Sequence, residues 1–210
     1  YRYVPETVTR ESSRGVRETL VTYGQQLRGE LTDRTLAVLV LGGAIHGSSR
    51  LVILTFVPLF VVRELGATLA AAGLVIALRG AARVVVPPFA GPLTGRFSRY
   101  HGLLFALGIM TVSIALIPFT RGVVWTGILV VSYIAGNALY SPILKEGVTD
   151  EASGDRRAGV VTAMYVFQFG GEALTPVIFG VILTVSGFKG LFVGVAVVIL
   201  AYTVLVRLVG

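Results

Sequence analysis

Six apolar runs, each about 20 residues long and separated by short loops, fill the chain from Thr35 to Gly210. A helix of about 18 or more apolar residues is long enough to cross the hydrocarbon core of a bilayer, which is about 30 Å thick. A helix at the surface of a water-soluble protein keeps a polar face instead. The composition agrees, because 54% of the residues are hydrophobic and only 14% are charged. The sequence therefore predicts an all-α polytopic membrane protein, a bundle of six transmembrane helices.

The predicted spans leave no room for a separate soluble domain in a chain of 210 residues. We expect the transmembrane domain at residues 35–210, with spans at 35–62, 68–93, 102–119, 123–144, 158–185 and 191–208. Residues 1–34 are more polar, and apolar side chains recur there at helical spacing, at Val16, Leu20, Tyr23, Leu27 and Leu31. This pattern predicts a linker with an amphipathic helix on the membrane surface. Because the chain begins with Tyr1 rather than Met, we expect it to be a piece of a longer polypeptide.

Lysine and arginine are distributed unequally between the two sides of the predicted bundle. One side carries the N-terminal stretch, Arg96, Arg99, Lys145, Arg156, Arg157 and Arg207, whereas the other carries only Arg63, Arg121 and Lys189. The positive-inside rule therefore places both chain ends in the cytoplasm, and we expect a multi-pass protein of the plasma membrane. This topology accounts for most of the net charge of +7, so no nucleic-acid partner is expected. Residues 145–157 are polar and predict a solvated loop between the fourth and fifth spans.

Polar side chains occur at mid-span in four of the six predicted helices, where an ionisable group is costly and usually functional. They are His46 and Arg50 in the first span, Arg79 and Arg83 in the second, Tyr133 and Asn137 in the fourth, and Gln168 and Glu172 in the fifth. His46 and Arg50 are four residues apart, as are Gln168 and Glu172, so each pair lies on one helix face. We therefore expect the first, second, fourth and fifth spans to share a wet or protein-lined interior.

The charges of these mid-span groups do not balance. Three arginines against Glu172 leave two positive charges, and a buried guanidinium without a partner is very unfavourable. The partner could be a carboxylate elsewhere in the protein, water in a cavity, or an anionic substrate. For Arg83, which is nearest the interface, an internal ion pair or snorkelling of the side chain to the interface is favoured. Glu172 is either the counter-ion of one arginine or a carboxyl group that takes up a proton during coupling, and the first interpretation is favoured.

The loop between the second and third spans carries a recognisable motif. It reads Gly-Pro-Leu-Thr-Gly-Arg-Phe-Ser-Arg over residues 91–99 and resembles the signature G-x-L-a-D-r-x-G-R-[KR] of the major facilitator superfamily, with matches at Gly91, Leu93, Arg96 and Arg99. Gly95 replaces the aspartate of the signature and Ser98 replaces its second glycine. Residues 56–60 and 63–66 resemble the passage "f-x-P-L-y … e-x-G" of the same superfamily.

The resemblance implies that the chain is the C-terminal six-helix half of a twelve-helix transporter, with the linker between the halves. It also implies an inverted repeat of three plus three helices. Its partners would be the bilayer, a small solute, and either the N-terminal half of the same polypeptide or a second copy. The four residues that match the signature would form a gating loop.

Three functions are compatible with these observations. The first is a secondary transporter of a small, anionic solute that works by alternating access, with Arg50 and Arg79 binding the solute and His46, Asn137 and Tyr133 assisting. The second is a proton-coupled multidrug efflux antiporter that uses Glu172 or His46. The third is a non-transporting membrane receptor or assembly subunit, which needs no solvated cavity. No enzyme, cofactor or metal site is predicted, because the sequence has no cysteine, no H-E-x-x-H motif and no nucleophile–base pair.

Overall fold

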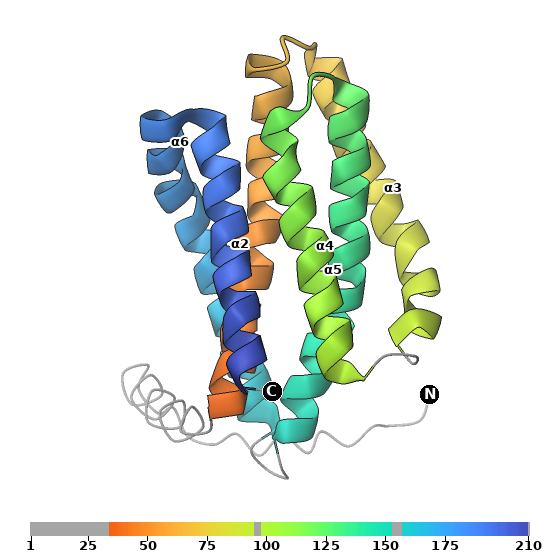
Figure 1. The fold of residues 1–210 in the computed structure, drawn as a ribbon, viewed down its shortest axis with the longest axis vertical. Helices are drawn as coiled ribbons and strands as arrows, with labels where there is room; N and C mark the ends of the chain where they lie inside the picture. Colours follow the sequence, from red (N-terminus) through yellow and green to blue (C-terminus); the bar gives the residue numbers. More distant parts are fainter. Residues whose placement is uncertain (1–33, 95–97, 153–156, 210) are drawn as a thin grey trace, which may run out of the picture.

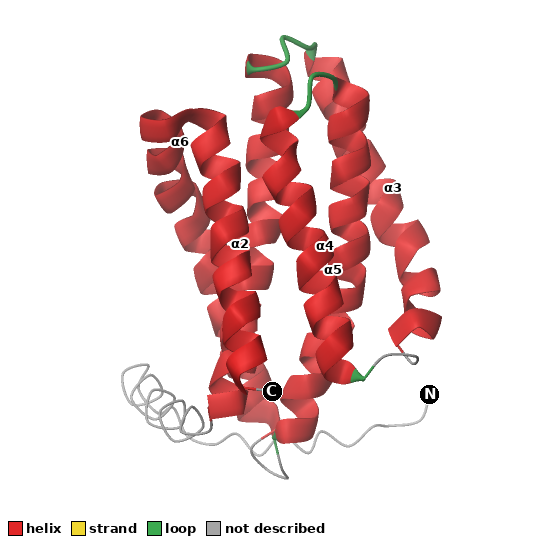
Figure 2. Ribbon diagram, in the orientation of Figure 1, coloured by secondary structure: helices red, strands yellow, loops and turns green. Residues whose placement is uncertain are grey.

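The structure, a computed structural model, describes residues 34–94, 98–152 and 157–209. Residues 1–33 of the predicted linker at 1–34 therefore lie outside the described residues, and so does Arg96, whereas Arg34 is the first residue of a helix. The described chain is helical apart from short turns (Figure 2). Its elements are α2 (Arg34–Arg63), α3 (Leu69–Thr94), α4 (Arg99–Leu116), the short 3-10 helix η1 (Ile117–Phe119), α5 (Val123–Glu151) and α6 (Arg157–Val209).

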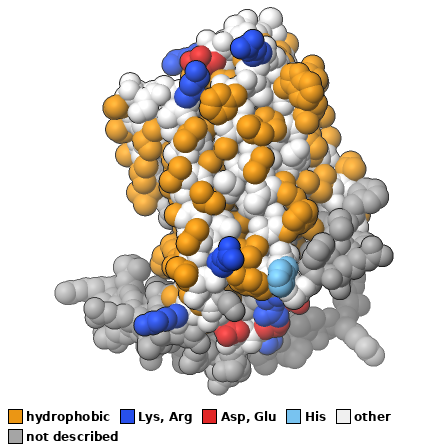
Figure 3. Space-filling model, viewed as in Figure 1, with side chains coloured by type: hydrophobic (Ala, Val, Ile, Leu, Met, Phe, Trp, Pro, Cys, Tyr) orange, Lys and Arg blue, Asp and Glu red, His pale blue; other side chains and the backbone are white. Residues whose placement is uncertain are grey.

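Five helices of the described chain are long and apolar enough to cross a membrane. They run roughly along one common axis, and the turn after α2 and the turn before α5 lie together at one end of the bundle (Figure 1). We call this end the Arg63 end and the opposite one, where α2 begins, the Arg34 end. On the face seen in Figure 3, charged side chains gather near the two ends, and hydrophobic side chains are spread over the middle. This distribution is the one that a hydrocarbon environment requires.

Helix α6 is too long for a single crossing. Its 53 residues would extend about 80 Å at about 1.5 Å per residue, far more than the thickness of a bilayer. The helix is interrupted at Gly187, whose φ of 65° and ψ of −170° are not helical. Only glycine adopts this conformation readily. The chain folds back at this residue (Figure 1), so α6 consists of a first arm, residues 157–186, and a second arm, residues 188–209.

The contacts of the second arm show that it runs antiparallel to α2. The ring of Phe192, near the start of this arm, packs edge to face on Phe60 at 5.7 Å between centroids. Near its end, the Tyr202 hydroxyl donates a hydrogen bond of 3.1 Å to the Val38 carbonyl. Because Val38 and Phe60 lie at opposite ends of α2, the two segments must run in opposite directions.

The first arm of α6 runs parallel to α2, and glycines let the two backbones approach closely. A Cβ atom on Gly171 would lie 2.6 Å from the Ala44 carbonyl oxygen, and a Cβ on Gly47 would collide with the carbonyl of Gln168. Small residues at a helix contact are the usual means of tight packing in membranes, where no hydrophobic force draws helices together. The close approach at these glycines determines which side chains of α2 and of the first arm of α6 can contact each other.

One predicted boundary is wrong: α5 was expected to end near residue 144, but it continues to Glu151. Gly147 and Val148 are buried and extend the stripe formed by Ile143 and Leu144, so packing favours the helix over a solvated loop. The extended helix also carries an ion pair between Asp150 and Arg99, the first residue of α4.

Candidate functional site

Polar side chains from α2 and α5 meet in the interior of the bundle. A hydrogen bond of 3.2 Å joins Asn137 Nδ2 to His46 Nδ1. The imidazole also stacks on the ring of Tyr140, with centroids 6.1 Å apart and planes inclined by 17°. The Tyr140 hydroxyl donates to the Gly42 carbonyl at 2.9 Å. His46 is thereby held in a defined orientation by α5.

A second contact between the same helices involves Tyr133. Its hydroxyl donates to Ser49 Oγ at 3.0 Å, and Ser49 Oγ in turn donates to the His46 carbonyl at 3.3 Å. Tyr133 and Ser49 are fully or almost fully buried. The sequence analysis did not single out Ser49, because a lone serine among small residues has no distinguishing pattern.

An ion pair connects α2 to the first arm of α6. Arg50 donates to Glu172 Oε1 through Nε at 3.1 Å and through Nη2 at 2.7 Å. Gln168 Nε2 lies 3.5 Å from the same carboxylate oxygen. The two side chains are partly buried, with 32% of Arg50 and 17% of Glu172 exposed. The charge of Arg50 is therefore neutralised within this chain.

Arg79 of α3 is in a different situation. Only 6% of the residue is exposed, and within the described chain its buried Nε has no hydrogen-bond partner. No carboxylate in residues 34–94, 98–152 and 157–209 forms an ion pair with it. Tyr133, Arg50 and Arg83 lie within electrostatic range, and the two arginines repel it. A buried donor that is left unsatisfied is costly, and more so when it is charged.

Of the remaining predicted site residues, Arg83 lies within electrostatic range of Arg79, and the others lie near the ends of α3 and α4. Arg83 is exposed on α3. Gly91 and Leu93, from the predicted gating loop, belong to the last turns of α3 rather than to a loop. Arg99 is exposed at the Arg34 end, where it pairs with Asp150.

The structure also brings together Lys145 and Tyr165, which the sequence analysis did not assign to a site. Lys145 Nζ lies 5.9 Å from the centroid of the Tyr165 ring, so a cation–π contact joins α5 to the first arm of α6. The sequence analysis placed Lys145 in a loop. The apolar stripe that continues through Val148 is the signal that could have placed it on a helix.

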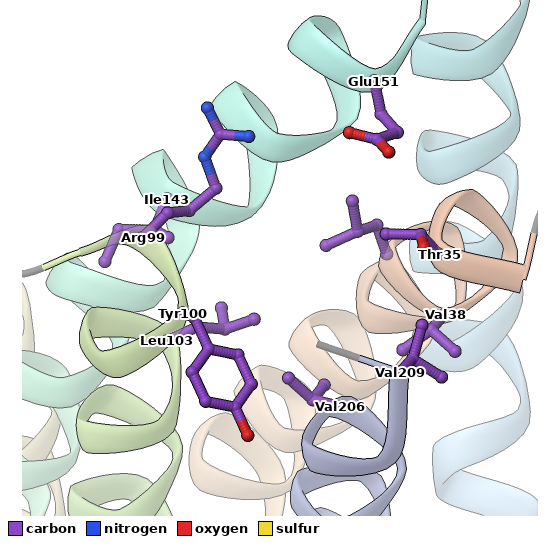
Figure 4. Close-up of a pocket in the computed structure, with 10 residues that line it drawn as sticks. Thr35, Val38, Arg99, Tyr100, Leu103, Ile143, Glu151, Val206 and Val209 are labelled. Carbon is purple, nitrogen blue, oxygen red and sulfur yellow. The ribbon is translucent and has the colours of Figure 1, made fainter.

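Two hollows lie outside this polar region. A cavity of about 190 Å³ at the Arg34 end is enclosed by α2, α4, α5 and the second arm of α6, with Arg99 and Glu151 at its rim and mainly apolar walls (Figure 4). A groove of about 520 Å³ lies between α2 and α6 and is lined almost entirely by apolar atoms. Ser48 lines this groove, and because Arg50 is two residues further along the helix, the groove lies on nearly the opposite side of α2 from the ion pair.

Comparisons with known proteins place this arrangement in a family. The family model for the Major Facilitator Superfamily matches residues 39–209, which include every residue of the polar region. The chain therefore belongs to the Major Facilitator Superfamily, a superfamily of membrane transporters.

Among solved structures, the chain is similar to the POT family transporter PepTSo, whose crystal structure was determined in meso. The TM-score is 0.70 and the sequence identity is 17%, over 84% of this chain and 37% of that one. At this identity the likeness concerns the fold alone, and the chain spans little more than a third of that transporter's length. None of the curated protein sequences that were compared matches the chain.

Proposed function

We propose that this chain forms one six-helix half, the C-terminal one, of a secondary transporter that moves a small anion by alternating access. Counting the two arms of α6 separately supports six crossings, and the unequal division of lysine and arginine supports a cytoplasmic location for both chain ends. In the inverted-repeat architecture of such carriers, α2, α3 and α4 form one repeat, and α5 with the arms of α6 forms the other. Membership of the superfamily supports this architecture.

The depth of the polar groups supports a substrate site near the middle of the membrane. At about 1.5 Å per residue, Arg79 lies roughly 15 Å from the start of α3, and Arg50 roughly 20 Å from the end of α2. Glu172 lies roughly 22 Å from the turn at Gly187 by the same rule. In a hydrocarbon core about 30 Å thick, all three groups are far from bulk water on the Arg63 side. Transporters of this architecture hold their substrates near this depth.

The buried Nε of Arg79, which has no hydrogen-bond partner among the described residues, is the observation that carries the anionic specificity. Arg50 already has Glu172 as a counter-ion, whereas Arg79 is buried and forms no ion pair with any carboxylate of the described residues. An oxyanion could accept two parallel hydrogen bonds from this guanidinium, an interaction that is strong in a low-dielectric cavity. Tyr133, His46 and Asn137 would contribute neutral hydrogen-bonding groups beside it.

The proposal is tested by transport in vesicles that contain the complete protein. Radiolabelled phosphate, sulfate, succinate and lactate would be offered to the wild type and to the variants Arg79→Gln, Arg79→Lys and Arg121→Gln. We expect uptake of at least one of these anions, loss of at least tenfold in Arg79→Gln, and wild-type uptake in Arg121→Gln, because Arg121 is an exposed cation in the turn before α5. Uptake of none of the four, or full uptake by Arg79→Gln, refutes the anion site.

A second candidate function, proton-coupled efflux of amphipathic compounds, is supported by one observation. Glu172 is the only carboxylate among the described residues of the interior, and it remains partly exposed beside Gln168. In this case Glu172→Gln should abolish the response of ethidium efflux to a pH gradient. If the protein instead transports an anion through Arg79, the Glu172→Gln variant should still take up that anion measurably, independently of the pH gradient.

A further inference from the structure

Lys145 occupies a position on α5 that the proposed substrate site does not explain. It lies eight residues beyond Asn137, or about 12 Å closer to the Arg34 end at about 1.5 Å per residue. Its ammonium group is not turned away from the bundle, because it lies over the ring of Tyr165 on the first arm of α6. The side chain therefore joins two of the helices that surround the polar region.

The side of α6 that Lys145 contacts is the side that carries the interior carboxylate. Tyr165, Phe169 and Glu172 follow one another at intervals of four and three residues, so they share one face of the first arm. The rings of Tyr165 and Phe169 stack, with centroids 6.3 Å apart and planes inclined by 24°. Lys145 also lies within electrostatic range of His46. These observations place the ammonium group on the same side as the ion pair and the half-buried His46.

The charge of Lys145 is not neutralised by any carboxylate in the described residues. The two ion pairs found there join Arg50 to Glu172 and Arg99 to Asp150. Glu146 is adjacent in sequence and therefore points about 100° away around the helix. Lys145 and Arg83 are exposed and Arg79 is buried, and the three cations together leave an excess of positive charge that continues along the bundle toward the Arg34 end.

We propose that Lys145 and Tyr165 form an anion station at the cytoplasmic mouth of the path to Arg79, where a carboxylate, phosphate or similar oxyanion binds before or after it occupies the central site. This inference rests on the proposed function and adds a second binding position to it. A lysine suits such a station, since its ammonium is a hydrated point charge on a flexible stem that can exchange partners rapidly. The aromatic ring keeps the ammonium facing the path when no anion is present.

The station can be tested without knowing the transported anion, because this chain contains no cysteine and any cysteine elsewhere in the complete protein can be replaced by serine. Ser141 lies one helical turn from both Asn137 and Lys145, so a Ser141→Cys thiol would report the local potential on that face of α5. In inside-out vesicles of the complete protein, its reaction rates with a negative and a positive methanethiosulfonate reagent would be measured. Their ratio depends on the nearby positive charge and not on transport activity.

We expect Lys145→Gln to lower the ratio of the negative to the positive reagent rate by roughly three- to tenfold, since one charge on a residue whose Cβ is about 6 Å from that of residue 141 acts oppositely on the two reagents and is partly screened. Lys145→Arg should preserve the ratio. Tyr165→Leu should lower it by a smaller factor, because the lysine is then free to leave the path. Lys189→Gln is the matched control, since it removes the same charge beside the turn at Gly187 and should leave the ratio unchanged.

Three outcomes would overturn the station. An unchanged ratio in Lys145→Gln would show that the ammonium does not face the path. A thiol that reacts with neither reagent until the protein is unfolded in dodecyl sulfate would show that the face is closed. The third outcome concerns lipids: if the effect of Lys145→Gln is present in phosphatidylcholine vesicles but disappears when phosphatidylglycerol is added, a lipid headgroup is the partner of the lysine. None of these outcomes touches the Arg79 transport assay, so the two proposals can fail separately.

Discussion

The ion pair between Arg50 and Glu172 makes a quantitative prediction about stability. The closest atoms are 2.7 Å apart, which corresponds to an attraction of about 6 kcal/mol at an effective dielectric constant of about 20. Desolvation cancels a large part of this, and the two side chains remain partly exposed. The coupling should therefore lie between that of a surface pair, about 0–1 kcal/mol, and the cost of breaking a fully buried one, about 3–5 kcal/mol. We expect about 1–3 kcal/mol.

A double-mutant cycle measures this coupling. The free energy of unfolding of the complete protein would be determined in mixed micelles for the wild type, Arg50→Gln, Glu172→Gln and the double variant. The pair between Arg99 and Asp150 provides the matched control, because it also joins two helices but is 42% and 50% exposed. Its coupling should stay below about 1 kcal/mol. A coupling at Arg50 and Glu172 no larger than that of the control would refute the assignment of Glu172 as the counter-ion of Arg50.

Two further predictions concern single residues. Tyr133→Phe removes the hydrogen bond of 3.0 Å to the buried Ser49 hydroxyl. It should lower the free energy of unfolding by about 1 kcal/mol, measured in the same micelles. A change below about 0.3 kcal/mol would mean that this hydrogen bond contributes nothing to the stability of the fold. Gly187→Ala places a Cβ on a residue with a φ of 65° and should cost about 1–3 kcal/mol. The matched variant Gly194→Ala, at a helical position with open space around it, should be neutral or slightly stabilising, and equal losses in the two variants would contradict the strained turn.

Much of the architecture could be anticipated because its causes are local. The length and apolarity of each segment fix how many times it can cross a bilayer, and spacing along a helix fixes that Gln168 and Glu172 share a face. The boundary of α5 could not be anticipated from polarity alone. The polarity of residues 145–151 is typical of a solvated loop. Gly147 and Val148 are nevertheless buried in the bundle, and this packing stabilises residues 145–151 as part of helix α5.

The pairing of charges shows the limit of the sequence most clearly. Arg50 and Arg79 both lie at a depth that Glu172 could match, and the sequence does not favour one over the other. The structure pairs Glu172 with Arg50 because glycines at positions 47 and 171 bring α2 against the first arm of α6. Arg79, on α3, is left without a partner in the described chain.

The amino-acid sequence by itself determined that charged groups lie deep among apolar helices. The length of an apolar segment and the position of a residue along it are properties of that segment alone. Only the tertiary structure decided which of these groups neutralise one another, which stay unsatisfied, and that Lys145 reaches across to Tyr165. Such contacts depend on the distance between helices that are far apart in sequence. That distance is set by the size of the side chains packed between them.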